Sequence, residues 1–237
     1  MTKHSIFSPS GADRWINCTG SIEVCKNIQK TSSSYADEGS KAHELAAWML
    51  SGGYKPYIPP EYKPVEMVRY VQKYVAYINK YKFKNIVNIT YIAVEETIDI
   101  PYIGMGTVDC FVLQDEHLHV FDLKYGKGKR VHATCNFQLM IYAYGIIDLF
   151  DGIQDIGAVE LHIIQPRINK DGRVDNWATS SVLIKRWFET VVVPTIDKIK
   201  AGDVGLQNGE WCWFCPARST CIEIISKDYD DAIQEEL

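Results

Sequence analysis

The sequence predicts an α/β or α+β protein whose central mixed β-sheet is flanked by helices. Two helical patterns come first along the chain, and three successive strand patterns begin near residue 89. A helix, a strand and a long helix follow, and this order is typical of a sheet core covered by helices. The chain has 237 residues, of which 46% are hydrophobic, so it can bury one sizeable core. We therefore expect a single domain over residues 1–237.

Hydrophobic spacing defines the expected elements, because apolar residues recur at different periods in helices and in strands. Helices are expected at 8–25 (a cap and a short helix), 37–50, 65–81, 136–150 and 181–201. Strands are expected at 89–100, 106–113, 118–125 and 158–165, with a further short strand after a turn at 169–172. Pro194 predicts a bend in the last helix, because proline lacks the N–H that a helix interior uses.

The helix expected at 65–81 carries a stripe of tyrosines beside its apolar positions: Tyr70, Tyr74, Tyr77 and Tyr81. One interpretation is that these rings belong to a wide buried face of an amphipathic helix. The other is that they are platforms on which nucleic-acid bases stack. The sequence leaves both interpretations open.

Charge and hydropathy exclude several classes of protein. The net charge of −5 argues against a general nucleic-acid coat protein, although it leaves room for a local basic track. The chain has no apolar run of eighteen residues and no apolar segment near its start. We therefore expect an intracellular protein with no membrane partner, whose oligomeric state stays open.

The seven cysteines are an odd number, which excludes a framework in which every cysteine forms a disulfide. Cys212, Cys215 and Cys221 lie close together near the C-terminus, whereas Cys18 lies near the start. In a reducing compartment, clustered thiols more often hold metal. Four thiolates suit either a zinc ion or an iron–sulfur cluster.

The hairpin expected over residues 106–124 brings carboxylates together. Asp122 and Lys124 share one face of a strand, and a symmetric loop at 114–117 would place Asp109 directly opposite Asp122. Two buried carboxylates so close need a proton or a cation, and Mg²⁺ or Mn²⁺ suits oxygen ligands. Lys124 could then orient a water and offset charge. The alternative is an exposed hairpin whose charges are solvated, and an odd loop would shift the pairing.

Four motifs between residues 38 and 142 resemble those of one nuclease superfamily. Gly106-Thr-Val-Asp109 and Asp122-Leu-Lys124 resemble the Gly-x-x-Asp and Asp-x-Lys motifs of PD-(D/E)XK nucleases. Upstream, Glu38-Gly-Ser-Lys-Ala-His43 resembles the Gly-x-x-x-His motif of the RecB-like branch of that superfamily. Downstream, Gln138-Leu-Met-Ile-Tyr142 is similar to the Gln-x-x-x-Tyr motif of the same branch.

This resemblance implies a restriction-endonuclease-like core over residues 36–200 that hydrolyses DNA with one or two Mg²⁺ or Mn²⁺ ions, acting as an exonuclease. It implies that the metal ligands are the side chains of His43, Asp109 and Asp122, with the backbone carbonyl of Leu123 as a further ligand. Lys124 would be the catalytic lysine, and Gln138 and Tyr142 would contact DNA or support the centre from one helix face.

The resemblance also implies a biological setting. The expected setting is phage or prophage DNA recombination or replication, with a recombination or helicase protein as a possible partner. Two alternatives remain: a protein of nuclease fold that binds DNA ends without cutting, and a zinc-stapled interaction protein.

The cysteine spacing resembles that of the 4Fe-4S nucleases of the RecB-like branch, namely AddB-type subunits and CRISPR-associated exonucleases. In these proteins one cysteine precedes the nuclease motifs and three follow them. The resemblance implies a 4Fe-4S cluster that joins residues 1–35 to residues 201–237, held by Cys18, Cys212, Cys215 and Cys221. Cys25 is the alternative to Cys18, and zinc is the alternative to the cluster. We expect Cys110 and Cys135 to be ordinary buried thiols.

Two basic segments are candidates for contact with nucleic acid. The glycine-rich loop after Lys124 carries three cations that could meet phosphates, namely Lys127, Lys129 and Arg130. Gln165 and Arg167 end the strand at 158–165, where a substrate would pass. The alternative for the loop is a solvated charge run without a ligand.

Overall fold

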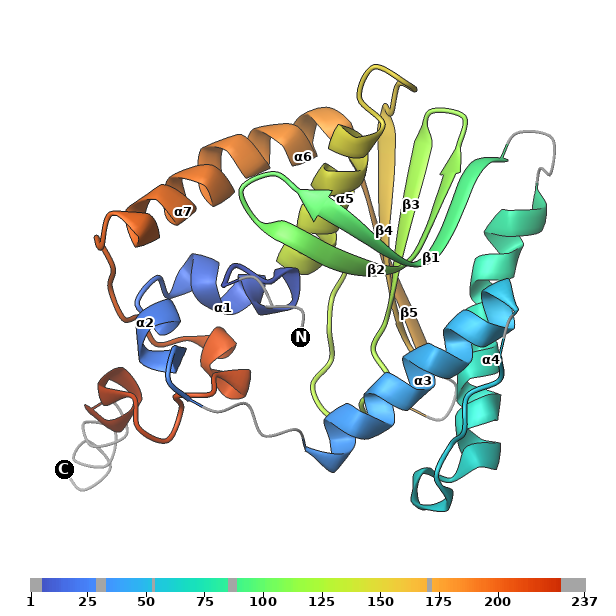
Figure 1. The fold of residues 1–237 in the computed structure, drawn as a ribbon, viewed down its shortest axis with the longest axis horizontal. Helices are drawn as coiled ribbons and strands as arrows, with labels where there is room; N and C mark the ends of the chain where they lie inside the picture. The colour runs from blue at the N-terminus through green and yellow to red at the C-terminus, as the bar shows by residue number, and fades with distance from the viewer. Residues whose placement is uncertain (1–5, 29–32, 53, 85–88, 170–171, 227–237) are drawn as a thin grey trace.

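A computed structural model describes residues 6–28, 33–52, 54–84, 89–169 and 172–226 of the chain (Figure 1). Its centre is a five-stranded sheet in the order β1-β2-β3-β4-β5. The β3–β4 pair is parallel and the other pairs are antiparallel. The strands are β1 (Ile89–Ile100), β2 (Gly104–Gln114), β3 (His117–Leu123), β4 (Ala158–Gln165) and β5 (Arg173–Ser180). The turn expected at 169–172 lies partly outside the described residues.

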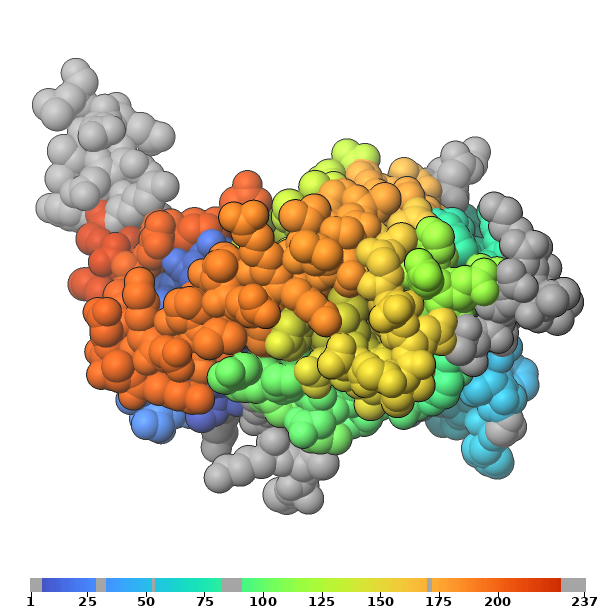
Figure 2. All heavy atoms as spheres, turned by 90° about the horizontal axis from the view of Figure 1, so that it is seen from above, coloured from blue at the N-terminus to red at the C-terminus, as the bar shows by residue number. Residues whose placement is uncertain are grey.

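Helices cover both faces of the sheet, which confirms the expected α/β class. They are α3 (Ser34–Ser51), α4 (Pro64–Lys84), α5 (Phe137–Leu149), α6 (Ser181–Trp187) and α7 (Val193–Lys200). On one face, Leu45 of α3 and Met67 of α4 belong to a buried cluster with Phe121 of β3. On the other face, Ile146 of α5 belongs to a second cluster with Phe111 of β2. Figure 2 shows α6 and α7, in orange, covering one side of the molecule next to α5 and β4, in yellow.

The β2–β3 hairpin has the register that the sequence predicts. A two-residue turn joins the strands, and their pairing runs without a shift as far as Cys110 and Phe121. An even loop of this kind keeps the alternating side chains of both strands on their expected faces. Asp109 and Asp122, the next residues on the two strands, therefore follow that last pair in opposite positions.

The long C-terminal helix is interrupted near Pro194, as expected. A π-helical turn, Phe188–Val192, separates α6 from α7. Pro194 lies at the start of α7, where it cannot donate the backbone hydrogen bond that a continuous α-helix would require. The helix begins at a clear cap, because the Ser180 side chain accepts a hydrogen bond from the Leu183 N–H.

The two ends of the described chain lie side by side. The N-terminal elements are η1 (Pro9–Gly11), α1 (Ala12–Asn17) and α2 (Ser21–Cys25), and the C-terminal one is η5 (Glu210–Phe214). The Gly20 N–H donates to the Gly205 carbonyl at 2.8 Å. A Cβ at Gly20 would lie 3.0 Å from the backbone of Gly205, so only glycine permits this approach. Figure 1 shows α1 and α2, in blue, beside the red C-terminal segment.

The tyrosine stripe of α4 is mostly packed against the sheet. Tyr74 is 1% exposed, and the rings of Tyr77 and Tyr81 contact Phe121 edge-on. The interpretation as a buried face is confirmed for these rings. No helix in the described segments is both long enough and apolar enough to span a membrane.

Candidate active site

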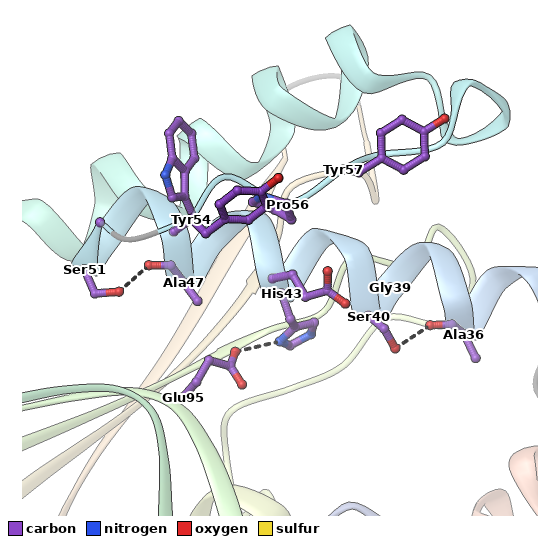
Figure 3. Close-up of a pocket in the computed structure, with 13 residues that line it drawn as sticks. Ala36, Gly39, Ser40, His43, Ala47, Ser51, Tyr54, Pro56, Tyr57 and Glu95 are labelled. Atoms are coloured by element: carbon purple, nitrogen blue, oxygen red, sulfur yellow. Dashed lines mark hydrogen bonds and ion pairs between the residues drawn. The ribbon is translucent and has the colours of Figure 1, made fainter.

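Three polar side chains from three different elements meet beside the sheet. His43 lies on α3, Glu95 on β1 and Asp109 on β2. The His43 Nδ1 atom lies 3.3 Å from Asp109 Oδ1 and 3.7 Å from Glu95 Oε1. Potential ligand atoms of the three residues all lie within 4.8 Å of one another, which is close enough for one metal ion to bind all three. Figure 3 shows His43 pointing from α3 toward Glu95.

Glu95 is the site residue that the sequence analysis missed. It has a φ of 50°, which places a non-glycine residue in the left-handed region within a β-strand. Its neighbours Val94 and Glu96 pair normally with β2, so the distortion is confined to this one position. Backbone strain of this kind clusters at functional sites. Glu95 lies opposite Asp109 in this pairing, and the sequence alone does not give the register of β1 on β2 that puts it there.

Asp109 and Asp122 occupy different environments. The Leu123 N–H donates to Asp109 Oδ2 at 2.7 Å, which leaves Asp109 Oδ1 facing His43. Asp122 is 3% exposed, and its Oδ2 atom has no hydrogen-bond partner among the described residues besides the Lys124 ammonium, with which it forms a 2.9 Å ion pair. A buried carboxylate oxygen with unused capacity is a natural ligand for a cation.

Lys124 is held in place by two partners. Its ammonium lies 2.9 Å from Asp122 Oδ2 and donates to Asp122 Oδ1 at 3.1 Å and to Gln138 Oε1 at 2.8 Å. Gln138 and Tyr142 lie one turn apart on α5, and Tyr142 is 7% exposed. Gln138 therefore contacts the lysine directly, and Tyr142 lies one turn further along the same helix.

Electrostatics in this group favour a bound cation. Burial raises the pKa of Asp122, and the Asp109 charge adds to that effect, although Lys124 opposes it. Burial opposes protonation of His43, yet Asp109, Glu95 and Asp122 outweigh it and raise the pKa of His43 to about 10. An imidazolium here balances carboxylate charge, which a dication would also do. The Tyr74 hydroxyl is buried nearby without a hydrogen-bond partner among the described residues.

A groove of about 930 Å³ runs along α3 beside these residues. His43 and Glu95 line it, together with Tyr54 and Tyr57 from the loop that follows α3 (Figure 3). These two tyrosines are 95% and 73% exposed. Exposed rings next to a candidate metal centre are suited to stacking on bases.

Gly39 lines the same groove, one turn before His43 on α3, and a Cβ added there would meet no atom within 4 Å. Replacing Gly39 by alanine is therefore expected to raise the free energy of unfolding by about 0.5–1 kcal/mol, because alanine is the better helix former. Urea unfolding measures this change. The matched control is Gly145→Ala in α5, where the new Cβ would lie 2.8 Å from Ile100 and should destabilise the protein. Destabilisation by Gly39→Ala would contradict the open geometry.

The structure gathers the cysteines expected to hold a cluster, without deciding between the two N-terminal candidates. The Cys18 sulfur accepts a hydrogen bond from the Gln207 N–H at 3.3 Å. The Cys25 sulfur lies 3.8 Å from the Cys215 sulfur. Burial raises the pKa of both the Cys18 and the Cys215 thiols. Cys212 and Cys221 are half-buried in the same C-terminal segment.

The expectation for the two remaining cysteines is correct for one of them. Cys110 is buried within β2, whereas Cys135 is exposed. Cys135 has a φ of 52° and lies just before the N-cap of α5, so the chain turns there at the surface. The prediction that Cys135 is an ordinary buried thiol is therefore wrong.

The residues predicted to contact phosphates differ in exposure: those of the basic loop lie at the surface, whereas Gln165 is buried. Lys127 and Arg130 are exposed, and Lys129 forms a 2.7 Å ion pair with Glu210 of the C-terminal segment. Gln165 is 2% exposed and uses its amide to hold the backbone of the basic loop at Lys129 and Val131. Gln165 therefore supports that loop and does not face a ligand.

Arg167 is also committed within the protein. Its guanidinium forms a 2.8 Å ion pair with Glu38 of α3 and lies 4.3 Å from the centre of the Tyr125 ring. The side chain of Arg167 is only 9% exposed. This geometry corrects the prediction of a phosphate contact, since Arg167 ties the end of β4 to the start of α3.

Comparison with known proteins places the chain in a family. A family model described as "Protein of unknown function (DUF2800)" matches residues 4–235. The chain belongs to this family. The matched residues include both the candidate metal centre and the cysteine segments.

Solved structures give distant likenesses. A protein from Eubacterium rectale described as a candidate exonuclease is 10% identical, with a TM-score of 0.48, over 91% of this chain and 88% of that one. An alkaline exonuclease from Laribacter hongkongensis is 12% identical, with a TM-score of 0.34, over 81% of this chain and 91% of that one. Likeness at this level establishes no shared activity.

Proposed function

We propose that this protein is a divalent-metal-dependent DNA nuclease that works from a DNA end. The observation that carries the proposal is the meeting of His43, Glu95 and Asp109 beside Lys124, whose ammonium is held by Asp122 and Gln138. Acidic ligands for a hard cation next to a fixed lysine match the chemistry of phosphodiester hydrolysis.

The donor set fits a magnesium or manganese ion. His43, Glu95 and Asp109 offer ligand atoms within 4.8 Å of one another, and Asp122 offers a buried carboxylate whose partner among the described residues is the Lys124 ammonium. The Leu123 carbonyl is a further candidate ligand. Carboxylate and carbonyl oxygens are the donors that Mg²⁺ and Mn²⁺ prefer. A bound dication would polarise the phosphate and lower the pKa of a ligated water.

In the proposed reaction, Lys124 stabilises the negative charge that develops on the phosphate. Water attack forms a new P–O bond, the bond to the leaving oxygen breaks, and negative charge builds on the phosphoryl oxygens. The Lys124 ammonium, fixed by Gln138 and Asp122, can offset that charge without having to reorganise. Its proton-bearing side chain can also orient the attacking water by hydrogen bonding.

DNA can reach the centre through the groove along α3. The exposed rings of Tyr54 and Tyr57 can stack on bases, and Gly39 leaves room for the strand beside His43. The exposed cations Lys127 and Arg130 lie on the loop that directly follows Lys124. These two cations supply local positive charge for phosphate binding, although the net charge of the whole chain is −5.

The cysteine group is proposed to hold a 4Fe-4S cluster that unites residues 1–35 with residues 201–237 around the nuclease core at 36–200. Contact between the two chain ends, such as the 3.8 Å separation of the Cys25 and Cys215 sulfurs, supports this arrangement. Among the described residues, no three cysteine sulfurs lie within 4.8 Å of one another. A tetrahedral zinc ion places sulfurs about 3.8 Å apart, and the Cys25–Cys215 separation equals that value, so zinc is the competing occupant that metal analysis must exclude.

Digestion of DNA tests the nuclease proposal. Wild-type protein with Mn²⁺ or Mg²⁺ is expected to degrade end-labelled linear DNA, to leave closed circular DNA intact, and to lose activity with a chelator. Glu95→Gln should lower the rate by about 100-fold, since a metal ligand is lost. The matched control is Glu96→Gln, the next residue of β1, whose activity should equal that of the wild type. Equal rates for both variants, or no digestion by the wild type, would contradict the proposal and favour a protein that only binds DNA ends.

A further inference from the structure

A second group of potential metal ligands lies on the opposite face of the sheet from Asp122. His119 on β3 pairs with Glu160 on the parallel strand β4, and Phe121 pairs with His162. Because side chains alternate along a strand, His119, Glu160 and His162 share one face, which α4 covers. None of the three contributes to the candidate active site.

The distances between these atoms match those around a tetrahedral zinc ion. Zinc bonds of about 2.0–2.2 Å to nitrogen and oxygen place ligand atoms about 3.3–3.6 Å apart. His119 Nδ1 lies 3.3 Å from both His162 Nε2 and Glu160 Oε2. His162 Nε2 lies 3.8 Å from the same Glu160 oxygen. Three corners of a tetrahedron are thus present, and the fourth is left for water.

Hydrogen bonds behind the group aim the ligand atoms at one point. The Tyr77 hydroxyl lies 3.1 Å from His162 Nδ1, so an N–H at Nδ1 can donate to it and leave the Nε2 lone pair directed at the group. Asn176 donates to Glu160 Oε1 at 2.6 Å, which leaves Oε2 for a cation. Partners of this kind orient the ligands of most protein metal sites.

Aromatic packing holds the two imidazoles in place. Phe121 stacks on His162 with ring centres 4.5 Å apart, and Tyr81 lies against His119 at 4.7 Å. Rings fixed in this way need little reorganisation to bind a metal ion.

We infer that His119, Glu160 and His162 form a zinc site that links β3 to β4 beneath α4. Two imidazole nitrogens and one carboxylate oxygen suit a borderline-soft dication such as Zn²⁺ better than Mg²⁺ or Mn²⁺. The inference is independent of the proposed nuclease activity, because the two ligand groups share no residue. The competing interpretation is a metal-free network in which the two histidines hydrogen-bond to each other and to Glu160.

Zinc binding by the full chain tests this inference. Protein is stripped with a chelator, dialysed against Zn²⁺ with excess Mg²⁺ present, and analysed for zinc per chain. Wild type is expected to retain one more zinc ion per chain than Glu160→Gln, whose amide oxygen can still accept from Asn176. Zinc held at the cysteines is the same in both proteins and cancels in the difference. Titration with Co²⁺ should give additional visible bands of a tetrahedral nitrogen–oxygen site in the wild type that Glu160→Gln lacks, while any bands from Co²⁺ at the cysteines are the same in both proteins.

Two further variants separate ligation from simple packing. His117→Gln changes an exposed histidine on the same strand and should bind zinc as the wild type does. Tyr77→Phe keeps the ring but removes the hydroxyl, and should weaken zinc binding by about 10–100-fold. Circular dichroism checks that each variant is folded without metal. Equal zinc content and equal Co²⁺ titrations for wild type, Glu160→Gln and Tyr77→Phe would overturn the zinc site in favour of the metal-free network.

Discussion

Replacing Lys124 by alanine is expected to lower the rate of metal-dependent DNA hydrolysis by about 10²–10³-fold, the usual effect of removing one preorganised group that stabilises transition-state charge. The ammonium is fixed by Gln138 at 2.8 Å and by Asp122 at 2.9 Å. Alanine offers neither charge nor a hydrogen bond to the phosphoryl oxygens. The rate is measured in single turnovers at saturating Mn²⁺ with end-labelled DNA.

The control for this variant is Lys127→Ala, which removes an exposed lysine three positions further along the loop. It should reduce DNA affinity slightly and leave the single-turnover rate unchanged, since it loses only a candidate phosphate contact. DNA binding by Lys124→Ala, measured with Ca²⁺ in place of Mn²⁺, should stay close to that of the wild type. A Lys124→Ala rate within about threefold of the wild-type rate would remove the lysine from the mechanism.

Replacing Cys215 by serine is expected to remove iron and acid-labile sulfide from the protein and to unfold the joined chain ends. The free energy of binding a structural metal becomes folding free energy, which for zinc sites is on the order of 10 kcal/mol. Segments 12–25 and 204–226 should then become sensitive to protease, while the sheet core stays folded. Iron and sulfide analysis, visible absorption and limited proteolysis measure the three effects.

Three serine variants complete this experiment. Cys18→Ser is expected to lose the cluster, because the Cys18 sulfur is buried and accepts a backbone hydrogen bond. Cys25→Ser is expected to keep it, and the reverse outcome would assign the ligand to Cys25. Cys135→Ser, at an exposed position outside the group, should have no effect. Purified wild-type protein that holds zinc and no iron would contradict the cluster.

Several parts of the site follow from local sequence patterns. The hairpin between β2 and β3 has a short even turn, so its register follows from alternation along two adjacent strands. The spacing of Gln138 and Tyr142 predicts a shared helix face, and both residues do lie beside the centre on α5. The bend expected at Pro194 follows from the chemistry of that one residue. Each of these predictions depends on residues that are near one another in the chain.

Other parts depend on contacts between distant segments. Arg167 ends a strand in a pattern typical of a substrate contact, but packing pairs it with Glu38, which lies far away in sequence. Cys110 lies inside an expected strand and Cys135 between the expected elements, but whether a connecting residue is exposed depends on the course of the chain. Exposure and pairing are set by the whole fold, so a single sequence does not predict them.

The sequence by itself determined the α/β class and the β2–β3 register that sets Asp109 opposite Asp122, because short-range periodicity encodes them, whereas the catalytic role expected of these residues and of Lys124 came from the resemblance of their motifs. Only the tertiary structure decided that Glu95 joins His43, since the register of β1 on β2 places Glu95 opposite Asp109 and α3 brings His43 to both. Tertiary structure likewise brought His119 and His162 together across parallel strands. Partners in a parallel pair are joined by a long crossover, so their register depends on packing and not on a turn.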